Sequence, residues 1–176
     1  MLTQELKKLK LQSELISVSR DCSDEDLTGT IEFVSDDAVV MCLYTDDGEY
    51  DGFTLFETHQ IDCLFWGNRE HEAIKLLVNE YGEHKKLKLH QQSFESLLFE
   101  LAETHSQLCF FHQQEEDSFD IGEIKAKDKE WIKIHTYGPK NSLSRLHKLI
   151  RIDTITRVTV DSPYQNKLLE LFNEQL

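Results

Sequence analysis

The sequence predicts a mainly β protein with flanking helices, built as a tandem duplication of a small five-stranded barrel. The segment Leu27–Ile31 recurs as Asp120–Ile124, so that Gly122 follows Gly29 at a spacing of 93. Apolar positions recur at the same spacing, and at 94 after one inserted residue. The pairs are Leu15 with Leu108, Ile31 with Ile124, Val39 with Ile132, Met41 with Ile134, Ile61 with Ile155, Leu64 with Val158, Ile74 with Leu168 and Leu77 with Leu171. A repeat of this length indicates two copies of one structural unit.

Each copy opens with a predicted helix. In the second copy Ser93 is a typical N-cap, and apolar residues follow it at helical spacing from Phe94 to Leu101. In the first copy Leu2, Leu6 and Leu9 form the corresponding stripe.

Five strand-like stretches follow in each copy, joined by short turns. The first copy has them at 14–19, 27–35, 38–45, 50–56 and 61–66, and the second at 107–112, 119–126, 130–137, 142–149 and 155–160. Ser35-Asp36-Asp37 and Asp46-Asp47-Gly48 are typical hairpin connections, because Asp and Gly favour tight turns.

Each copy closes with a predicted helix. Asn68 is the expected cap in the first copy, and Ser162-Pro163-Tyr164-Gln165 is a strong helix start in the second. The domains are therefore predicted at 1–82 and 93–176, with a polar linker at 83–92.

Composition excludes several classes of protein. The chain has 176 residues and four cysteines, none of them in a C-x-x-C pair, so neither a disulfide framework nor a zinc site is expected. The eight histidines lack metal-site spacing, and no metal or cofactor is predicted. No apolar run is long enough to span a bilayer, and no signal peptide is evident, so the expected location is cytoplasmic.

The net charge of −14 is unevenly distributed. Residues 1–80 hold 6 basic and 18 acidic side chains, whereas residues 81–176 hold 13 and 15. A strongly acidic first half argues against unspecific binding of nucleic acid. It is typical of a solvated surface, and it leaves open an acidic mimic that blocks a nucleic-acid-binding enzyme.

A helix followed by five short, bent strands resembles the SH3-like small barrels, and in its detailed order the Sm-like family. Gly29 and Gly122 match the glycine that begins the family's second strand. The apolar fourth strands, Gly52–Phe56 and Leu149-Ile150, and the isoleucines Ile61 and Ile155 that follow them also match. The resemblance covers both copies, and it implies two barrels and association or RNA binding.

The family's RNA pocket does not carry over to this chain intact. The Met-Asn pair that opens the third strand is replaced by Ala38-Val39 and Trp131-Ile132. Before the fifth strand, the Arg-Gly step is replaced by Thr58-His59-Gln60 in the first copy. Arg151-Ile152-Asp153 keeps only the arginine in the second.

Comparison of the copies predicts which strand residues face the core. The inward set is Ile31, Phe33, Val39 and Met41 with Ile124, Ala126, Ile132 and Ile134. The outward set of the first copy is Glu32, Val40, Cys42, Tyr44, Cys63 and Phe65. Val40, Tyr44, Cys63 and Phe65 are the candidate interface, covered either by another molecule or by a part of the same chain.

The matching outward positions of the second copy are Lys125, Lys133, His135, Tyr137, Arg157 and Thr159, which make a mostly basic face. Lys125, Lys133, His135, Arg151 and Arg157 are the candidate residues for binding RNA or an acidic partner, which includes the acidic copy of another molecule. A purely solvated face is the alternative. With no catalytic motif and no small-molecule site in the sequence, the leading hypothesis is a non-catalytic module for protein association, with a protein partner or a homo-oligomer. RNA binding through the second copy is the alternative.

Overall fold

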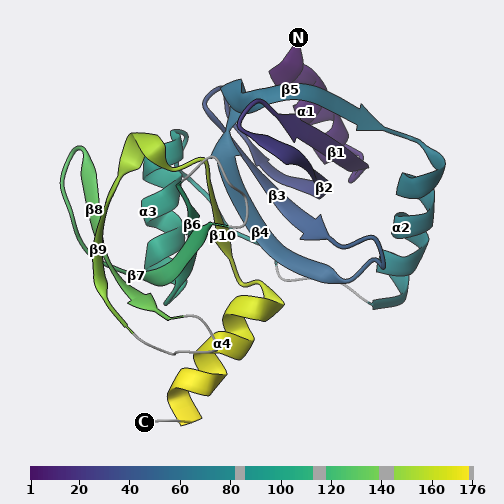
Figure 1. Ribbon diagram of the computed structural model, residues 1–176. Coiled ribbons are helices and arrows are strands. Elements are labelled where there is room, and N and C mark those ends of the chain that lie inside the picture. Colours follow the sequence, from purple (N-terminus) through teal and green to yellow (C-terminus); the bar gives the residue numbers. More distant parts are fainter. Residues whose placement is uncertain (82–85, 113–117, 139–144, 175–176) are drawn as a thin grey trace.

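The computed structural model describes residues 1–81, 86–112, 118–138 and 145–174 (Figure 1). Repeat 1 contains α1 Leu2–Leu11, β1 Leu15–Arg20, β2 Ser23–Val34, β3 Ala38–Tyr44, β4 Tyr50–Glu57, β5 Ile61–Trp66 and α2 Arg69–Tyr81. Repeat 2 contains α3 Phe94–Thr104, β6 Leu108–Phe111, β7 Phe119–Lys127, β8 Trp131–Tyr137, β9 His147–Arg151, β10 Arg157–Val160 and α4 Pro163–Glu174. The prediction of a mainly β protein with helices flanking each five-stranded unit is confirmed.

The strands form one antiparallel, open sheet of ten strands, in the order β5-β1-β2-β3-β4-β10-β6-β7-β8-β9. The prediction of two closed barrels is therefore wrong. Within each repeat the sheet bends around its own core, as the two curved halves of Figure 1 show. The halves are continuous because the fourth strand of repeat 1 pairs with the fifth strand of repeat 2.

Neither repeat closes on itself, because its fourth and fifth strands do not pair with each other. The turns Thr58–Gln60 and Ile152–Thr154 separate the fourth strand from the fifth in each repeat. The fifth strand then pairs with the first strand of its own repeat, β5 with β1 and β10 with β6. The open side of β4 is left for β10, and the sheet continues into repeat 2.

The duplication is visible in the strand register. Gly29 lies opposite Leu43, and Gly122 lies opposite Thr136 at the same spacing of 93. Across the first strand pair, however, Ile16 lies opposite Gly29 and Leu108 opposite Gly122. The residue numbers of equivalent positions in the two repeats therefore differ by 92 in the first strand, by 93 in the second and third strands, and by 94 afterwards. The predicted pairing of Leu15 with Leu108 is wrong by one residue.

The helix caps are those predicted. The Ser93 hydroxyl accepts a hydrogen bond from the Ser96 amide, and the Asn68 side chain accepts one from the His71 amide at 2.8 Å. Ser162 and Gln165 form a reciprocal pair, in which each side chain accepts from the other's backbone amide.

Both repeats have a β-bulge at the same place, and it changes which side chains face the core. The register shifts between Ile31 and Phe33 in β2, and between Ile124 and Ala126 in β7. Because a bulge adds one residue to a strand, it reverses the alternation of side chains that follows. Ala126 is therefore exposed, contrary to the prediction, and Phe33 pairs with Val40 on the outer face. Ile31, Met41 and Ile134 are buried as predicted, whereas Ile124 is only partly buried.

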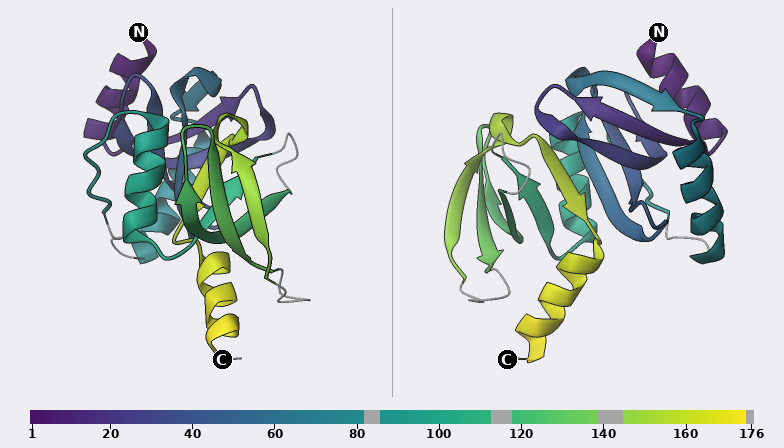
Figure 2. Two further views of the ribbon diagram at one scale, coloured as in Figure 1. Left: turned by 90° about the vertical axis from the view of Figure 1, so that its left-hand side faces the viewer. Right: turned by 45° about the vertical axis from the view of Figure 1, so that its right-hand side comes forward.

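The core has three parts. Beneath α1, repeat 1 has its own core, which includes Leu6, Leu9, Ile16 and Met41. The largest cluster joins the repeats around α3, which lies between the two halves of the sheet in Figure 2. A small cluster under α4 contains Cys109, Phe111, Ile121, Leu168 and Phe172.

Among the described residues, no helix has both the length and the apolarity needed to cross a membrane.

Candidate interaction surface

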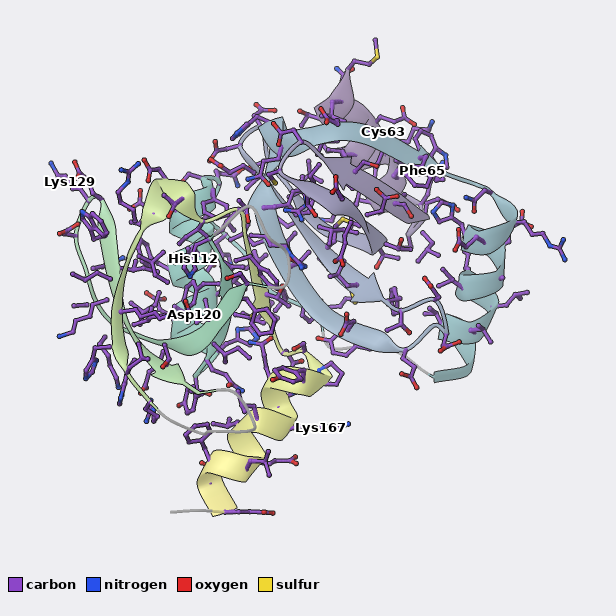
Figure 3. The ribbon with its side chains drawn as sticks, viewed as in Figure 1. Cys63, Phe65, His112, Asp120, Lys129 and Lys167 are labelled. Carbon is purple, nitrogen blue, oxygen red and sulfur yellow. The ribbon has the colours of Figure 1, made fainter. Side chains whose placement is uncertain are left out.

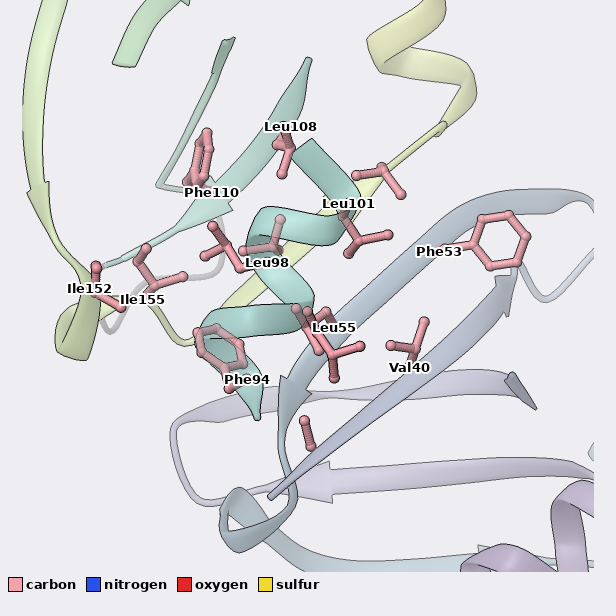
Figure 4. Packing of buried hydrophobic residues seen from close by; sticks show 14 of the residues in the cluster. Val40, Phe53, Leu55, Phe94, Leu98, Leu101, Leu108, Phe110, Ile152 and Ile155 are labelled. Atoms are coloured by element: carbon pink, nitrogen blue, oxygen red, sulfur yellow. The ribbon is translucent and has the colours of Figure 1, made fainter. Parts of the chain in front are cut away.

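The predicted apolar patch of repeat 1 is covered by repeat 2. Val40 is 0% exposed, and it belongs to the cluster that also contains Phe94, Leu97 and Leu101 of α3. Tyr44 packs against the same cluster. In Figure 4, α3 passes between β4, with Phe53 and Leu55, and the strands of repeat 2. From the sequence, the patch could be covered by another molecule or by a part of the same chain. The structure shows that a part of the same chain covers Val40 and Tyr44.

Cys63 and Phe65 belong to a different surface. Both lie on β5, on repeat 1 and away from repeat 2 (Figure 3). Cys63 is exposed, and the partly buried Phe65 ring lies 5.7 Å from the His71 ring of α2. The four predicted interface residues therefore do not form one surface.

In repeat 2, the strand positions that correspond to the covered face around Val40 and Leu55 are open to solvent. We call this surface the outer face of repeat 2, and it consists of Glu123, Lys125, Trp131, Lys133, His135, His147, Leu149 and Arg151. Cross-strand pairing places Trp131 beside Arg151, Lys133 beside Leu149 and His135 beside His147. Trp131 is 38% exposed and Leu149 is 66% exposed, so the surface is partly apolar as well as basic.

Glu123 organises the cations at one side of this face. Its carboxylate accepts from Lys125 and from Arg145, each at 2.8 Å. Partial burial alone would raise its pKa, but the hydrogen bonds from Lys125 and Arg145 hold the pKa of Glu123 below its usual range.

The two histidines of the outer face stack on each other. The rings of His135 and His147 lie 4.3 Å apart, with an interplanar angle of 19°. Desolvation, followed by the positive charges of Arg145 and His147, lowers the pKa of His135. The His135 ring therefore binds a proton less readily than an isolated histidine does.

Two of the predicted basic residues have other roles. Arg151 lies on the outer face, but both of its guanidinium contacts go to Asp153, at 2.7 and 2.6 Å. Arg157 is 8% exposed, and its guanidinium lies 3.7 Å from the centroid of the Phe111 ring. The prediction that Arg157 points outward with Lys133 is wrong, because the fifth strand is buried at the junction between the repeats.

The sheet has two free edges, one on each repeat. β5 and β9 are the terminal strands and pair on one side only. β5 carries Ile61–Trp66 and β9 carries His147–Arg151. Such edges present unpaired backbone amides and carbonyls to any strand that approaches.

Sequence reasoning missed four members of the outer face, Glu123, Trp131, His147 and Leu149. Trp131, His147 and Leu149 alternate with buried Ile132 and Ile150, so the period of two could have revealed Trp131 and Leu149. Within the described residues, no group of three or more His, Cys, Asp or Glu side chains is arranged to hold a metal ion.

No protein-family model, curated protein or solved structure matches this chain.

Proposed function

We propose that this chain is a non-catalytic association module, which binds a protein through β9 and the outer face of repeat 2. The observation that carries the proposal is the junction inside the chain. There the equivalent surface of repeat 1 is already an interface, with β10 along β4 and α3 across Val40 and Leu55. The helix and strand order of each repeat supports an Sm-like origin for this mode of association, although neither unit is a closed barrel.

The junction provides a template for the partner. Val158 pairs with Leu55, Thr159 with Thr54 and Val160 with Phe53. Thr159 also donates a hydrogen bond to the Thr54 hydroxyl at 3.2 Å. At the free edges, the repeat spacing of 94 makes Leu149 the counterpart of Leu55, and Leu64 the counterpart of Val158. A second copy that repeats the junction would place its Leu64 opposite Leu149.

Charge favours the same partner. The first 80 residues carry a net charge of −12, and the outer face of repeat 2 presents Lys133 and Lys125. Complementary potentials steer two proteins together and fix their orientation. An acidic partner protein with a free strand would share the net charge and the open strand edge of repeat 1.

Analytical ultracentrifugation over a range of concentrations tests the proposal. We expect a species larger than the monomer. The association should weaken as salt is added, because salt screens the attraction between charges. Leu149→Glu places a charge where the template has a buried leucine, and it should shift the sample to the smaller species. Leu76→Glu is the matched control, because Leu76 is also exposed but lies on α2.

The outcomes separate the possible partners. Loss of association in Leu149→Glu but not in Leu76→Glu supports a second copy. A wild-type chain that is monomeric at every concentration, yet retains an acidic protein from its host only when Leu149 is intact, supports a different partner. A monomer whose capture of proteins is the same with and without the substitution would contradict the proposal.

RNA binding is the second candidate, favoured by the exposed Trp131 and the stacked pair of His135 and His147. Aromatic rings beside cations are the usual platform for unstacked bases. Fluorescence anisotropy with a single-stranded oligonucleotide at low salt tests it. Lys133→Glu should weaken binding without unfolding the chain, whereas Arg157→Glu is unsuitable because Arg157 is buried. Absence of binding by the wild-type chain at low salt removes this candidate.

A further inference from the structure

A pair of histidines lies at one end of the β8–β9 ladder of repeat 2. His135 on β8 is directly opposite His147 on β9. Their rings are stacked, with a centroid distance of 4.3 Å and an interplanar angle of 19°. His147 is the first residue of β9, and β9 is an edge strand of the sheet. The histidine pair therefore belongs to the surface that we propose for association.

The same cross-strand pair in repeat 1 is uncharged and covered. Cys42 and Phe53 are the counterparts of His135 and His147, and they also lie directly opposite each other, on β3 and β4. Each is 1% exposed and belongs to the cluster that α3 forms with repeat 1. Covering this face with a helix thus removes the pair from water.

A partner that covers the face in the same way favours one charge state of the histidines. Neutral imidazole leaves water at a modest cost, whereas a buried imidazolium without a counterion is strongly disfavoured. Two imidazolium rings stacked as closely as His135 and His147 would also repel each other. Such a partner therefore binds the neutral pair and displaces any proton that the free pair carries.

The acidic neighbour of the pair is already engaged by cations. Glu123 on β7 lies opposite His135, and its Oε1 is 3.8 Å from Nδ1 of that ring. The same oxygen accepts from Lys125 and from Arg145, each at 2.8 Å. Glu123 therefore attracts a proton to His135 only weakly.

The cations around the pair oppose protonation. Desolvation, followed by the charges of Arg145 and His147, lowers the pKa of His135 in spite of Glu123. Lys133 lies two residues before His135 on the same face of β8 and adds a further positive charge.

A second copy docked as at the junction would bring an uncharged ring to the pair. There β10 places Val160 opposite Phe53. At the free edges, the repeat spacing of 94 makes Trp66 the counterpart of Val160, as His147 is of Phe53. Trp66 is 42% exposed on the edge strand β5. Its indole would face His147 and supply no carboxylate that could hold a proton there.

We propose that the histidine pair makes association through β9 dependent on pH, because the contact forms on the neutral pair and opens as the pair gains protons. This inference rests on the proposed function and adds its regulation. The contact lowers the affinity of the pair for protons, so its full strength is present above the pH range in which histidine titrates and is lost as the pH falls through that range. With an ordinary histidine pKa of about 6.5, release of one proton per contact makes the association constant about tenfold smaller at about pH 5.5 than at about pH 7.5.

Analytical ultracentrifugation of the wild-type chain at these two pH values and one ionic strength is the test. Combining His135→Gln with His147→Phe removes both titrating rings and installs the counterpart residue of repeat 1 at position 147. We expect this double variant to associate equally at both pH values. His90→Gln is the matched control, because the His90 side chain is 76% exposed and lies on the linker, outside the outer face. Circular dichroism checks that each chain is folded at both pH values.

A second measurement counts protons on the wild-type chain itself. The heat of dissociation on dilution, measured by calorimetry in two buffers with different heats of ionisation, gives the number of protons exchanged. We expect protons to be taken up as the contact opens. This measurement tests the inference even if the double variant fails to fold.

The outcomes separate the regulation from the association. Weaker association at the lower pH in the wild-type chain and in His90→Gln, but not in the double variant, supports the inference. An association constant that is unchanged or larger at the lower pH, or the same pH dependence in the double variant, overturns it and leaves association through β9 intact. If the chain is a monomer at both pH values and retains no protein through Leu149, the association and its regulation both fall.

A partner other than a second copy is tested in the same way. A protein that the immobilised chain retains through Leu149 should elute when the pH is lowered from about 7.5 to about 5.5, a step that spans the ordinary histidine pKa. Elution from the wild-type chain but not from the double variant supports the inference. Equal elution from both chains overturns it.

Discussion

The outer faces of the two repeats use the same strand positions for opposite purposes. In repeat 1 these positions hold Val40, Phe53 and Leu55, which are fully buried against α3. In repeat 2 the corresponding residues are Lys133, His147 and Leu149, which are exposed. The difference shows that the strands themselves tolerate either lining. What decides the residue type is whether a helix from the neighbouring repeat lies over the face.

The two opening helices differ in the same way. α1 covers only the core of repeat 1, and its remaining surface carries Lys7, Lys8 and Lys10. α3 contacts both repeats through Phe94, Leu97, Leu98 and Leu101. Asp37, in the β2–β3 turn of repeat 1, accepts a hydrogen bond from the Phe94 amide at 2.7 Å. Repeat 1 therefore caps the first turn of a helix that belongs to repeat 2.

Exchanging residues between the two faces gives the largest expected effect. Val40→Lys copies repeat 2 into repeat 1 and places an ammonium group beneath α3. We expect it to lower the free energy of unfolding by about 4–5 kcal/mol, because the charge is buried without a partner. Urea denaturation followed by circular dichroism measures the change.

The reverse exchange is the control. Lys133→Val copies repeat 1 into an exposed position, so the free energy of unfolding should change by less than about 0.5 kcal/mol. If Val40→Lys were as mild as Lys133→Val, α3 would not cover repeat 1 in solution.

A smaller effect is expected from truncating the inner face. Ile134 is fully buried, so Ile134→Ala should lower the free energy of unfolding by about 3 kcal/mol. Ile124 is only partly buried beside the bulge, and Ile124→Ala should cost about 1 kcal/mol. Equal losses in denaturation experiments would mean that Ile124 is as well packed as Ile134.

The smallest effect is expected in the chemical reactivity of two cysteines, which can be measured without destabilising the chain. Burial raises the pKa of the Cys42 thiol to about 11, and the residue lies under α3. Cys63 is exposed on β5. Iodoacetamide at neutral pH should therefore modify Cys63 within minutes and spare Cys42 until the chain unfolds, as mass spectrometry of peptides would show. A Cys63→Ser variant identifies the mass-spectrometric signal of modified Cys63. Rapid modification of Cys42 would argue that α3 does not cover it.

Local features could be predicted from the sequence. Ser93, Asn68 and Ser162 cap helices because their side chains meet amides a few residues away. Gly29 recurs as Gly122 because a Cβ at Gly29 would lie 2.0 Å from the Cys42 carbonyl oxygen, and one at Gly122 would lie 2.7 Å from that of His135. Each of these features depends on a short stretch of chain.

Features that depend on distant parts of the chain could not be predicted. Nothing in Phe53–Leu55 specifies that β10, rather than β5, will pair with β4. The apolar Val40 indicates that a cover exists, but the cover is a helix that starts 54 residues later, at Phe94. The bulge at Ile124 was also missed, because one extra residue leaves no mark in an apolar pattern, and it alone reversed the assignment of Ala126.

The pairing of β10 with β4 has a consequence for the order in which the molecule forms. Thr54 and Thr159 meet across 105 residues, and β10 follows the other nine strands of the described sheet along the chain. All five strands of repeat 1 can pair before repeat 2 is made, yet Val40 and Leu55 stay uncovered until α3 emerges. The edge of β4 stays open for longer still, until residue 160 has been added. Pairing over such a separation is slow. The nascent chain therefore carries an uncovered apolar face from the completion of β4 until α3 is made, and an unpaired strand edge from then until β10 is made.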